Sequence, residues 1–400
     1  MLRKRLSTFL LFPVLLVAFA GDLAAKPKEP EADGILVGGF VLHPGADVAL
    51  AYDGRGSQGL DDGFIEIGAH FHTHLADEDS KAWHNKLSLG WQQFFGVGDA
   101  EPNGGLNVRI LSEADLFKQG TFRLEPSFGY TYVDDPEDDN LRRDFEHHQV
   151  RARLALAFQP NGGKVFSETL SYQFRGWFYT DHSDVSHHEN LVASETRWNF
   201  LPQTGMSLRA EFRYIGYIED NASVQLVKDA TATQNLTSMP VRLKYSVQGL
   251  LFARFHAQIG LGYAYEYYEN GPSEHMFIAN ARLRFDFNEN SDIYLEYRKD
   301  FDNVVYGDYY KYHRGILGFE GLWFDHLQTE LELGYGYFDF RSNRQHDRED
   351  SLLTANALVA YHIFPGMSVG LNYRLRYNTS DTANASYVKN LVTLQFSYEY

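Results

Sequence analysis

Polar and apolar residues alternate along most of the chain with a period of two. The alternation is clearest at 207–214, 281–287 and 371–377, where charged and apolar residues exchange at every step. Successive side chains of a strand point to opposite faces, so this period is typical of a strand between water and an apolar phase. The pattern therefore predicts strands that have one polar and one apolar face.

The predicted strands are about twice as long as the five or six residues of an ordinary soluble sheet, and many end in Tyr or Phe. Strands that cross a bilayer need roughly nine to eleven residues or more, and they must close into a ring because lipid offers no partner to a sheet edge. The pattern predicts about eighteen of them. They lie at 40–52, 63–74, 82–95, 105–116, 121–133, 144–158, 165–180, 189–201, 205–218, 238–248, 252–268, 275–287, 292–301, 309–322, 326–340, 351–363, 367–378 and 386–400.

The connections between these segments alternate between short and long. Short ones, rich in Pro, Gly and Asn, lie at 159–163, 202–205, 288–291 and 365–366. Long ones lie at 53–62, 96–105, 134–144, 181–188, 219–237 and 341–350. Outer-membrane barrels have short periplasmic turns and longer extracellular loops. We therefore expect residues 39–400 to form an all-β, transmembrane antiparallel up-and-down β-barrel, and an even strand number places both termini in the periplasm. Pro44 and Pro126 are the residues that fit a strand ladder least well.

The first residues have the composition of an export signal. The basic stretch MLRKR precedes a largely apolar run at 9–20 that ends in Ala-Phe-Ala. A membrane anchor is the alternative, but a run of about a dozen residues is shorter than the roughly 20 that a bilayer needs. We expect a signal peptide at 1–20, followed by a flexible periplasmic tether at 21–38.

The last residues alternate in the same way and end on an aromatic ring. Leu394, Phe396, Tyr398 and Tyr400 share one face. This pattern resembles the terminal signal by which the barrel assembly machinery recognises outer-membrane barrels. Together with the export signal, it predicts the outer membrane of a Gram-negative bacterium, and outer-membrane lipid as a partner.

Composition and charge exclude several other classes. The chain has no Cys, so disulfides and thiolate metal sites are excluded. Its formal net charge is -17 at pH 7, which argues against a nucleic-acid partner. Its 22% of charged residues leaves no room for a bundle of membrane helices.

A barrel of about eighteen strands encloses a lumen wide enough for water. Basic residues outnumber acidic ones on the predicted lumen face, and such a wall attracts anions. The alternative is that most of these charges pair across neighbouring strands and only keep the wall hydrated. The candidate channel-lining residues are Arg109, Arg151, Arg153, Arg175, Arg209, Glu211, Arg213, Arg242, Lys244, Arg282, Arg284, Glu296, Arg298, Arg374 and Arg376.

One stretch carries a family resemblance. Residues 40–53, FVLHPGADVALAYD, resemble the start of the second β-barrel porin family, whose members open with a His-Pro strand and a Tyr-Asp-rich hairpin. Here Gly54 stands where the family has Asn. The resemblance implies a barrel that exports an exopolysaccharide or capsular polysaccharide together with a periplasmic polysaccharide export protein. It also offers aromatic lumen residues such as Trp177 and Tyr294 for stacking on sugar rings, and the alternative is that each of them only fills space in the wall.

Enzymatic and metal-binding functions have little support in the sequence. No Ser and His are spaced as a catalytic pair would require, so we expect no enzyme and no cofactor. His70, His72 and His74 share one face of a strand, an arrangement that fits a zinc site or, alternatively, histidines that face the lumen without metal. Polysaccharide export is our first functional expectation. A general or anion-preferring diffusion porin is the first alternative, and an outer-membrane enzyme or adhesin is the second.

Overall fold

The computed structural model describes residues 34–37, 40–54, 62–75, 83–95, 104–117, 120–133, 146–180, 183, 186–201, 203–218, 223–224, 233–234, 237–269, 273–303, 309–341, 348–382 and 385–400. The expected signal peptide, most of the expected tether and parts of most long loops lie outside these residues.

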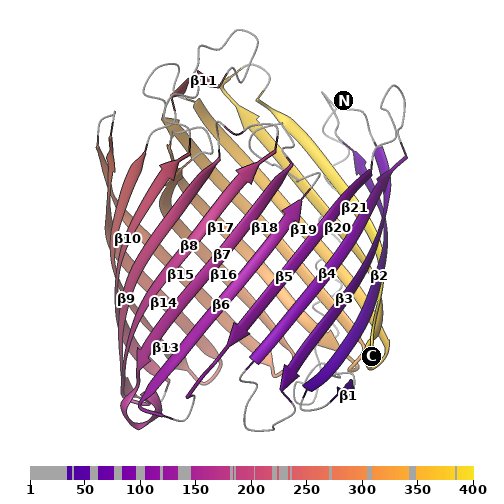
Figure 1. Cartoon of the computed structure of the whole chain (residues 1–400), viewed down its shortest axis with the longest axis horizontal. Helices are drawn as coiled ribbons and strands as arrows, with labels where there is room; N and C mark the ends of the chain where they lie inside the picture. Colours follow the sequence, from indigo (N-terminus) through magenta and orange to yellow (C-terminus); the bar gives the residue numbers. More distant parts are fainter. Residues whose placement is uncertain are drawn as a thin grey trace.

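Eighteen antiparallel strands form a closed barrel (Figure 1). The first nine are β2 (Phe40–Gly54), β3 (Asp62–Leu75), β4 (Trp83–Phe94), β5 (Gly104–Ala114), β6 (Phe122–Val133), β7 (His147–Phe158), β8 (Phe166–Tyr179), β9 (His187–Leu201) and β10 (Thr204–Tyr217). The second nine are β13 (Ser238–Phe252), β14 (Phe255–Tyr268), β15 (Glu274–Asn288), β16 (Ser291–Asn303), β17 (Tyr309–Trp323), β18 (Leu327–Arg341), β19 (Arg348–Phe364), β20 (Met367–Ser380) and β21 (Tyr387–Glu399). Each pairs with the next along the chain, and β2 closes the ring against β21 from Gly45↔Glu399 to Gly54↔Asn390.

Three short strands lie outside the ring. β1 (Ile35–Val37) folds back on the start of β2, and β11 (Ser223–Val224) pairs with β12 (Thr233–Gln234) within the connection from β10 to β13. None of the described residues belongs to a helix that is long and apolar enough to cross a membrane.

The all-β, up-and-down barrel predicted from the alternation is confirmed, and each predicted segment corresponds to one strand of the ring. The largest boundary error is at the end of β13, which continues to Phe252 instead of stopping at residue 248. Three consecutive apolar residues, 250–252, break the alternation there, and the register with β14 shifts between Leu250 and Phe252. An irregular pairing of this kind hides a strand end from any analysis based on period alone.

Both prolines that fitted poorly lie within strands. Pro126 is in β6, whose ladder with β5 stops at Glu113↔Ser127 and resumes only as an isolated bridge, Leu116↔Leu124. The ladder with β7 continues on the other side of Pro126 without interruption. The prediction that Pro126 interrupts a ladder therefore holds on one side only, the side where its missing N–H leaves a gap.

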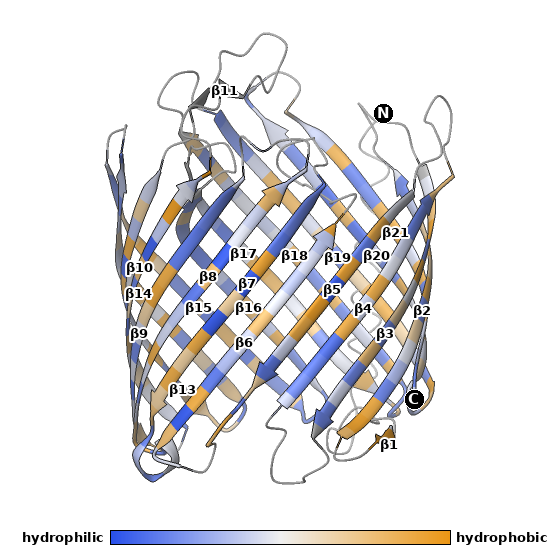
Figure 2. Ribbon diagram, viewed as in Figure 1, coloured by the Kyte–Doolittle hydropathy of each residue, from blue (hydrophilic) through white to orange (hydrophobic). Residues whose placement is uncertain are grey.

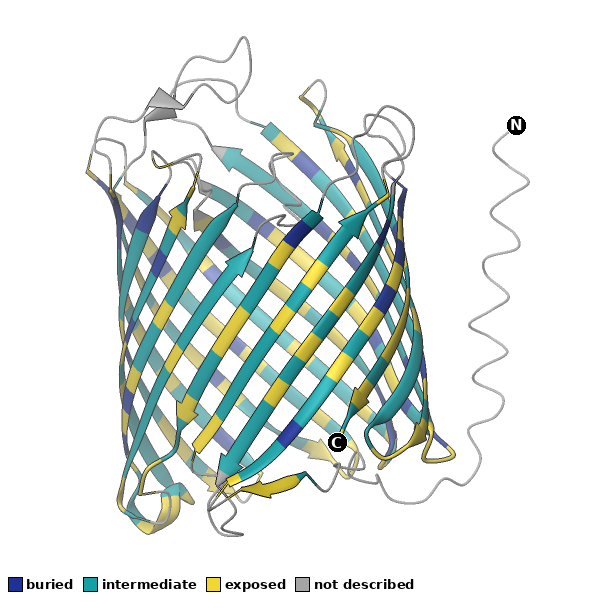
Figure 3. Ribbon diagram, turned by 45° about the vertical axis from the view of Figure 1, so that its right-hand side comes forward, coloured by how far each residue is buried: buried dark blue, intermediate teal, exposed yellow. Residues whose placement is uncertain are grey.

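The two faces of the strands differ as the alternation predicts. Large apolar side chains such as Leu208 and Phe212 on β10 are about half exposed and point outward. Small side chains such as Ala155 and Ala264 are fully buried on the inner face. Apolar and polar bands alternate along the strands in Figure 2, and exposed and less exposed bands alternate in Figure 3. An apolar exterior around a closed sheet identifies a transmembrane barrel.

The connections at the two ends differ in length. We call the end that holds the β9–β10, β15–β16 and β19–β20 connections the turn end, because each of these three connections has only two residues. In the β19–β20 turn, Gly366 has a φ of 82°, which a type II turn requires after Pro365. The opposite end, the loop end, holds the longest connection, from Tyr217 to Ser238. This asymmetry is the one predicted from the sequence.

The lipid-facing surface yields the first prediction. Leu261, midway along β14 and 63% exposed, points outward. We expect Leu261→Arg to lower the free energy of unfolding in lipid vesicles by about 2–4 kcal/mol, because an arginine near the bilayer midplane loses its hydration. Gln258→Arg, which points inward from the same strand, is the matched control and should cost clearly less. Equal losses in the two variants would contradict the assignment of the two faces.

Candidate functional site: the interior wall

Outward-facing apolar residues determine which side chains line the interior. On β10, Leu208 and Phe212 face outward, so Arg209, Glu211 and Arg213 face inward. The same reasoning on β5, β7, β8, β13, β15, β16 and β20 places every one of the predicted channel-lining residues on the inner face. Because the strands pair in register, side chains distant in sequence become neighbours along this wall.

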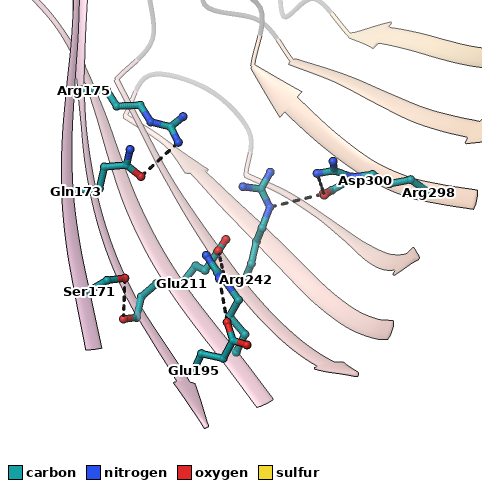
Figure 4. Close-up of polar contacts among 10 residues, drawn as sticks. Ser171, Gln173, Arg175, Glu195, Glu211, Arg242, Arg298 and Asp300 are labelled. Carbon is teal, nitrogen blue, oxygen red and sulfur yellow. Dashed lines mark hydrogen bonds and ion pairs between the residues drawn. The ribbon is translucent and has the colours of Figure 1, made fainter. Parts of the chain in front are cut away.

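Most of the interior arginines are neutralised by carboxylates on the same or a nearby strand. Arg209 lies 3.0 Å from Glu195 on β9 and 2.5 Å from Glu211 on its own strand. Asp300 on β16 pairs with Arg298 at 3.1 Å and with Arg242, on β13, at 3.6 Å (Figure 4). Arg242 also donates a hydrogen bond of 2.7 Å to the carbonyl of Phe301.

A second carboxylate is shared between two arginines. Glu189 on β9, largely buried, lies 3.8 Å from Arg175 on β8 and 3.9 Å from Arg213 on β10. Arg175 also donates to the side-chain oxygen of Gln173 at 3.3 Å (Figure 4). Asp302 on β16 lies 3.8 Å from Arg213 on β10 and so connects β16 to this group.

The remaining pairs follow the same principle. Arg153 lies 3.5 Å from Glu125, and Arg284 lies 2.7 Å from Asp286. Glu296, another predicted lining residue, lies 3.8 Å from Arg282. The sequence left open whether the basic residues of the wall attract anions or pair with carboxylates. Most of these basic residues pair with carboxylates on the same or a nearby strand.

Four predicted basic residues differ from the rest. Among the described residues, no carboxylate lies within 4.0 Å of Arg109, Arg151, Lys244 or Arg374. Three of them, all arginines, are exposed on the inner face. Their charge is therefore available to a solute in the lumen.

Arg109 and Arg374 line one recess of the wall, although they belong to β5 and β20. The lining also includes the small residues Ala49, Gly68 and Gly90 and the carboxylates of Asp47 and Glu66. Gly68 and Gly90 are directly paired on β3 and β4. The wall is recessed there because two neighbouring positions lack side chains.

The aromatic residues proposed from the sequence are occupied by protein contacts. The ring of Trp177 stacks on His187 at 4.7 Å between centroids. Tyr294 lies under the Arg282 guanidinium, 4.7 Å from it, and its hydroxyl donates to Glu332 at 3.2 Å. Stacking on sugars stays a prediction for both residues.

Sequence reasoning missed a larger aromatic group at the loop end. Tyr310 and Tyr312 on β17 pair directly with Phe340 and Phe338 on β18, and the centroids of the paired rings lie 5.3 and 5.9 Å apart. The signal was present as inward-facing aromatic residues at alternate positions of both strands. Only the register shows that they meet.

His70, His72 and His74 share the inner face of β3, as the sequence suggested. No three of the described His, Asp and Glu side chains are placed to hold a metal ion between them. His43 on β2 and His84 on β4, which the sequence analysis did not connect with them, adjoin the same group. Leu394, Phe396 and Tyr398 of the predicted assembly signal lie on the outer face of β21, the strand that closes the ring, and Tyr400 follows its last residue. Their role in assembly stays a prediction.

Comparison with known proteins finds only solved structures of low similarity. No family model matches the chain, and no curated protein matches it. The structure of OpdK from Pseudomonas aeruginosa, an outer-membrane protein solved with vanillate, is 10% identical with a TM-score of 0.49, covering 90% of this chain and 99% of that chain. OccK9 (OpdG) from the same organism is 11% identical with a TM-score of 0.49, covering 90% and 98%. The alcaligin receptor FauA from Bordetella pertussis is 11% identical with a TM-score of 0.41, covering 89% and 76%.

The fold is that of an outer-membrane β-barrel, as its own strand pairing and apolar exterior require. The comparisons give no support to the polysaccharide-export family that residues 40–53 resemble.

The shared carboxylate of Glu189 yields the second prediction. Glu189→Gln leaves Arg175 and Arg213 without their common partner, so the wall gains positive charge. In planar bilayers, we expect the chloride-to-potassium permeability ratio to rise by about twofold. Glu349→Gln, which removes an exposed, outward-facing carboxylate at the loop end, is the control. The same rise in both variants would show that the effect does not come from the interior wall.

Proposed function

We propose that this protein is a passive diffusion channel of the outer membrane that prefers small anions. The observation that carries the proposal is the group of Arg109, Arg151, Lys244 and Arg374. They lie on the inner wall of a closed barrel, and no carboxylate of the described residues lies within 4.0 Å of any of them. Basic side chains that line a pore attract anions and favour their passage.

The paired charges contribute differently. An arginine with a carboxylate at 3 Å, such as Arg209 with Glu195, has a field that falls off within a short distance. It keeps the wall hydrated but attracts few ions. We therefore assign the selectivity to the uncompensated residues, and the hydration of the lumen to the paired ones.

Polysaccharide export, our first expectation, is not carried forward. It depended on the resemblance of residues 40–53, and neither the comparisons nor the interior wall adds support to it. Trp177 and Tyr294, the rings proposed to stack on sugars, already contact His187 and Arg282. A strain that lacks the gene tests the export hypothesis directly, because normal surface polysaccharide in that strain rejects it.

The proposal also treats the chain as a non-enzyme, without a cofactor. A lipase assay on the purified barrel in detergent tests this point against the enzyme alternative.

The uncompensated arginines yield the third prediction. We expect Arg109→Gln combined with Arg374→Gln to lower the chloride-to-potassium permeability ratio by about twofold or more, because the wall of the recess loses two positive charges. The ratio follows from the reversal potential of the purified protein in a planar bilayer under a salt gradient. Lys299→Gln, which removes an outward-facing positive charge from β16, is the control and should leave the ratio unchanged.

A wild-type protein that forms no conducting channel would refute the proposed function. A conducting channel whose permeability ratio does not respond to the double substitution would refute the role given to the two arginines.

The orientation of the barrel is part of the proposal. We infer that the turn end faces the periplasm and the loop end faces the cell exterior, as in other barrels with this asymmetry. Because the chain has no Cys, single cysteines can report it. We expect Thr382→Cys at the loop end to react with a membrane-impermeant maleimide in intact cells, and Asp325→Cys at the turn end to react only after permeabilisation. The reverse labelling would overturn the orientation.

A further inference from the structure

The loop-end part of β16 leaves its place beside β15. The ladder between the two strands ends at Ala279↔Lys299, although both strands extend farther toward the loop end. The ladder between β16 and β17 continues to Asn303↔Tyr309. The two strands therefore separate from β15 together, as a hairpin.

We call residues 300–303 of β16 and 309–312 of β17 the hairpin end. By alternation, Phe301 belongs to the face of β16 that carries the exposed, outward side chains of this strand. Its ring is nevertheless only 3% exposed and packs in one cluster with Ala264 on β14 and Ile278 on β15. Both of these residues belong to the inner face of the barrel. The hairpin end therefore lies inside the lumen, with its outward face against the inner wall.

Contacts with a strand farther around the ring support this position. Arg242 on β13 donates a hydrogen bond of 2.7 Å to the carbonyl of Phe301, and its Cζ atom lies 4.9 Å from the centre of the Phe301 ring. Arg242 also lies 3.6 Å from Asp300 (Figure 4). Three strand intervals, roughly 14 Å along the wall, separate β13 from β16. An arginine side chain is shorter than that, so β16 must cross toward β13 inside the barrel.

Two more ion pairs agree with this position. Asp302 lies 3.8 Å from Arg213 on β10, which is one strand farther from β16 than β13 is. Lys311 on β17, the cross-strand partner of Phe301, lies 3.0 Å from Glu274 on β15. Glu274 lies on the inner face of β15, and Lys311 shares the outward face of the hairpin with Phe301. The ion pair and the buried ring therefore place the same face of the hairpin against the wall.

The inner face of β14 is low where Phe301 rests on it. Its inward-facing positions 260, 262 and 264 are Gly, Gly and Ala, and the last of these is fully buried. Small residues in a strand allow another backbone to approach closely. The sequence contains this run of small residues at alternate positions, but only the structure shows which segment covers it.

The hairpin end is also held from the other side. β17 stays paired with β18 as far as Tyr309↔Arg341, so the sheet bends inward there without a break. The aromatic rings of β17 and β18 that meet at the loop end belong to this part of the sheet. The hairpin end is thus attached through its backbone to β18 and through side chains to β10, β13, β14 and β15.

We propose that the hairpin end is a constriction of the channel, and that Phe301 and Arg242 are the positioning residues that hold it against the inner wall. The inference rests on the proposed channel function, since a constriction acts only on solutes that pass. It goes beyond that function because the uncompensated basic residues select a solute by its charge, whereas the hairpin end limits its size.

The first test measures the position of the hairpin end and needs no conduction. The chain has no Cys, so Ile278→Cys reports whether the Phe301 ring covers the wall. In detergent, we expect a water-soluble maleimide to label Ile278→Cys about tenfold more slowly than Arg282→Cys, an exposed position on the same face of β15. Phe301→Ala should raise the labelling rate of Ile278→Cys by about tenfold, because the cover is lost.

The second test measures single-channel conductance in planar bilayers. We expect Phe301→Ala to raise the conductance by about half or more, because the released hairpin end no longer narrows the lumen. The size of the largest polyethylene glycol that enters the channel and lowers its conductance should increase as well. Arg242→Met removes the hydrogen bond to Phe301 and leaves Asp300 paired with Arg298, and it should act in the same direction in both tests.

Phe94→Ala is the matched control. Phe94 lies on the inner face of β4 at the loop end and packs on Phe64 with 5.1 Å between ring centroids. The same substitution therefore removes a ring from the wall without changing a contact of the hairpin end. Phe94→Ala should leave the labelling rate of Ile278→Cys and the conductance at their wild-type values. The circular dichroism of each variant shows that its strands have folded.

The outcomes separate the two proposals. Equal labelling rates of Ile278→Cys with and without Phe301→Ala overturn the constriction. A conducting channel whose conductance and size limit are the same in the wild type, Phe301→Ala and Arg242→Met also overturns it, and both results leave the proposed function standing. A wild-type protein that forms no conducting channel refutes the proposed function and the constriction with it.

Discussion

The constraint on which this structure depends is that lipid provides no hydrogen-bond partner for the backbone. Every N–H and C=O group in the hydrocarbon region must be satisfied by a neighbouring strand, so the sheet must close. Closure is achieved where β2 meets β21, and it turns the alternation of side chains into an apolar exterior and a polar interior. At Pro126, which has no N–H, the ladder is lost on one side only, and the rest of the ring maintains the fold.

A second constraint applies to the interior wall. Charged side chains that face the lumen are stabilised by nearby side chains of opposite charge. Cross-strand register supplies these partners, for example by placing Glu195 opposite Arg209 and Glu189 between Arg175 and Arg213. A fully paired wall would be hydrated and unselective. In the proposed channel, selectivity arises where the register leaves a basic residue more than 4.0 Å from every described carboxylate, as at Arg109 and Arg374.

The same geometry builds two groups that carry no fixed charge of their own. The aromatic group of β17 and β18 lies at the loop end, and the neighbouring histidines of β2, β3 and β4 lie at the turn end. Each consists of side chains at alternate positions on adjacent strands, so that each strand contributes a short row and pairing turns the rows into a patch. The two mouths of the barrel therefore differ in chemistry.

The sequence by itself determined the fold class, all eighteen ring strands, the difference between the two ends and the face on which each candidate residue lies. These features depend on the period-two alternation of polar and apolar residues and on the turn-forming residues, both of which are local properties of the sequence. The tertiary structure decided which inward-facing charges are neutralised, because that depends on the stagger between strands, and a shift by two residues leaves the alternation unchanged while it exchanges every partner. It therefore also decided that Arg109 and Arg374 share a recess and that His43 and His84 join the histidines of β3. Contacts between positions far apart in the chain have no counterpart in a local pattern.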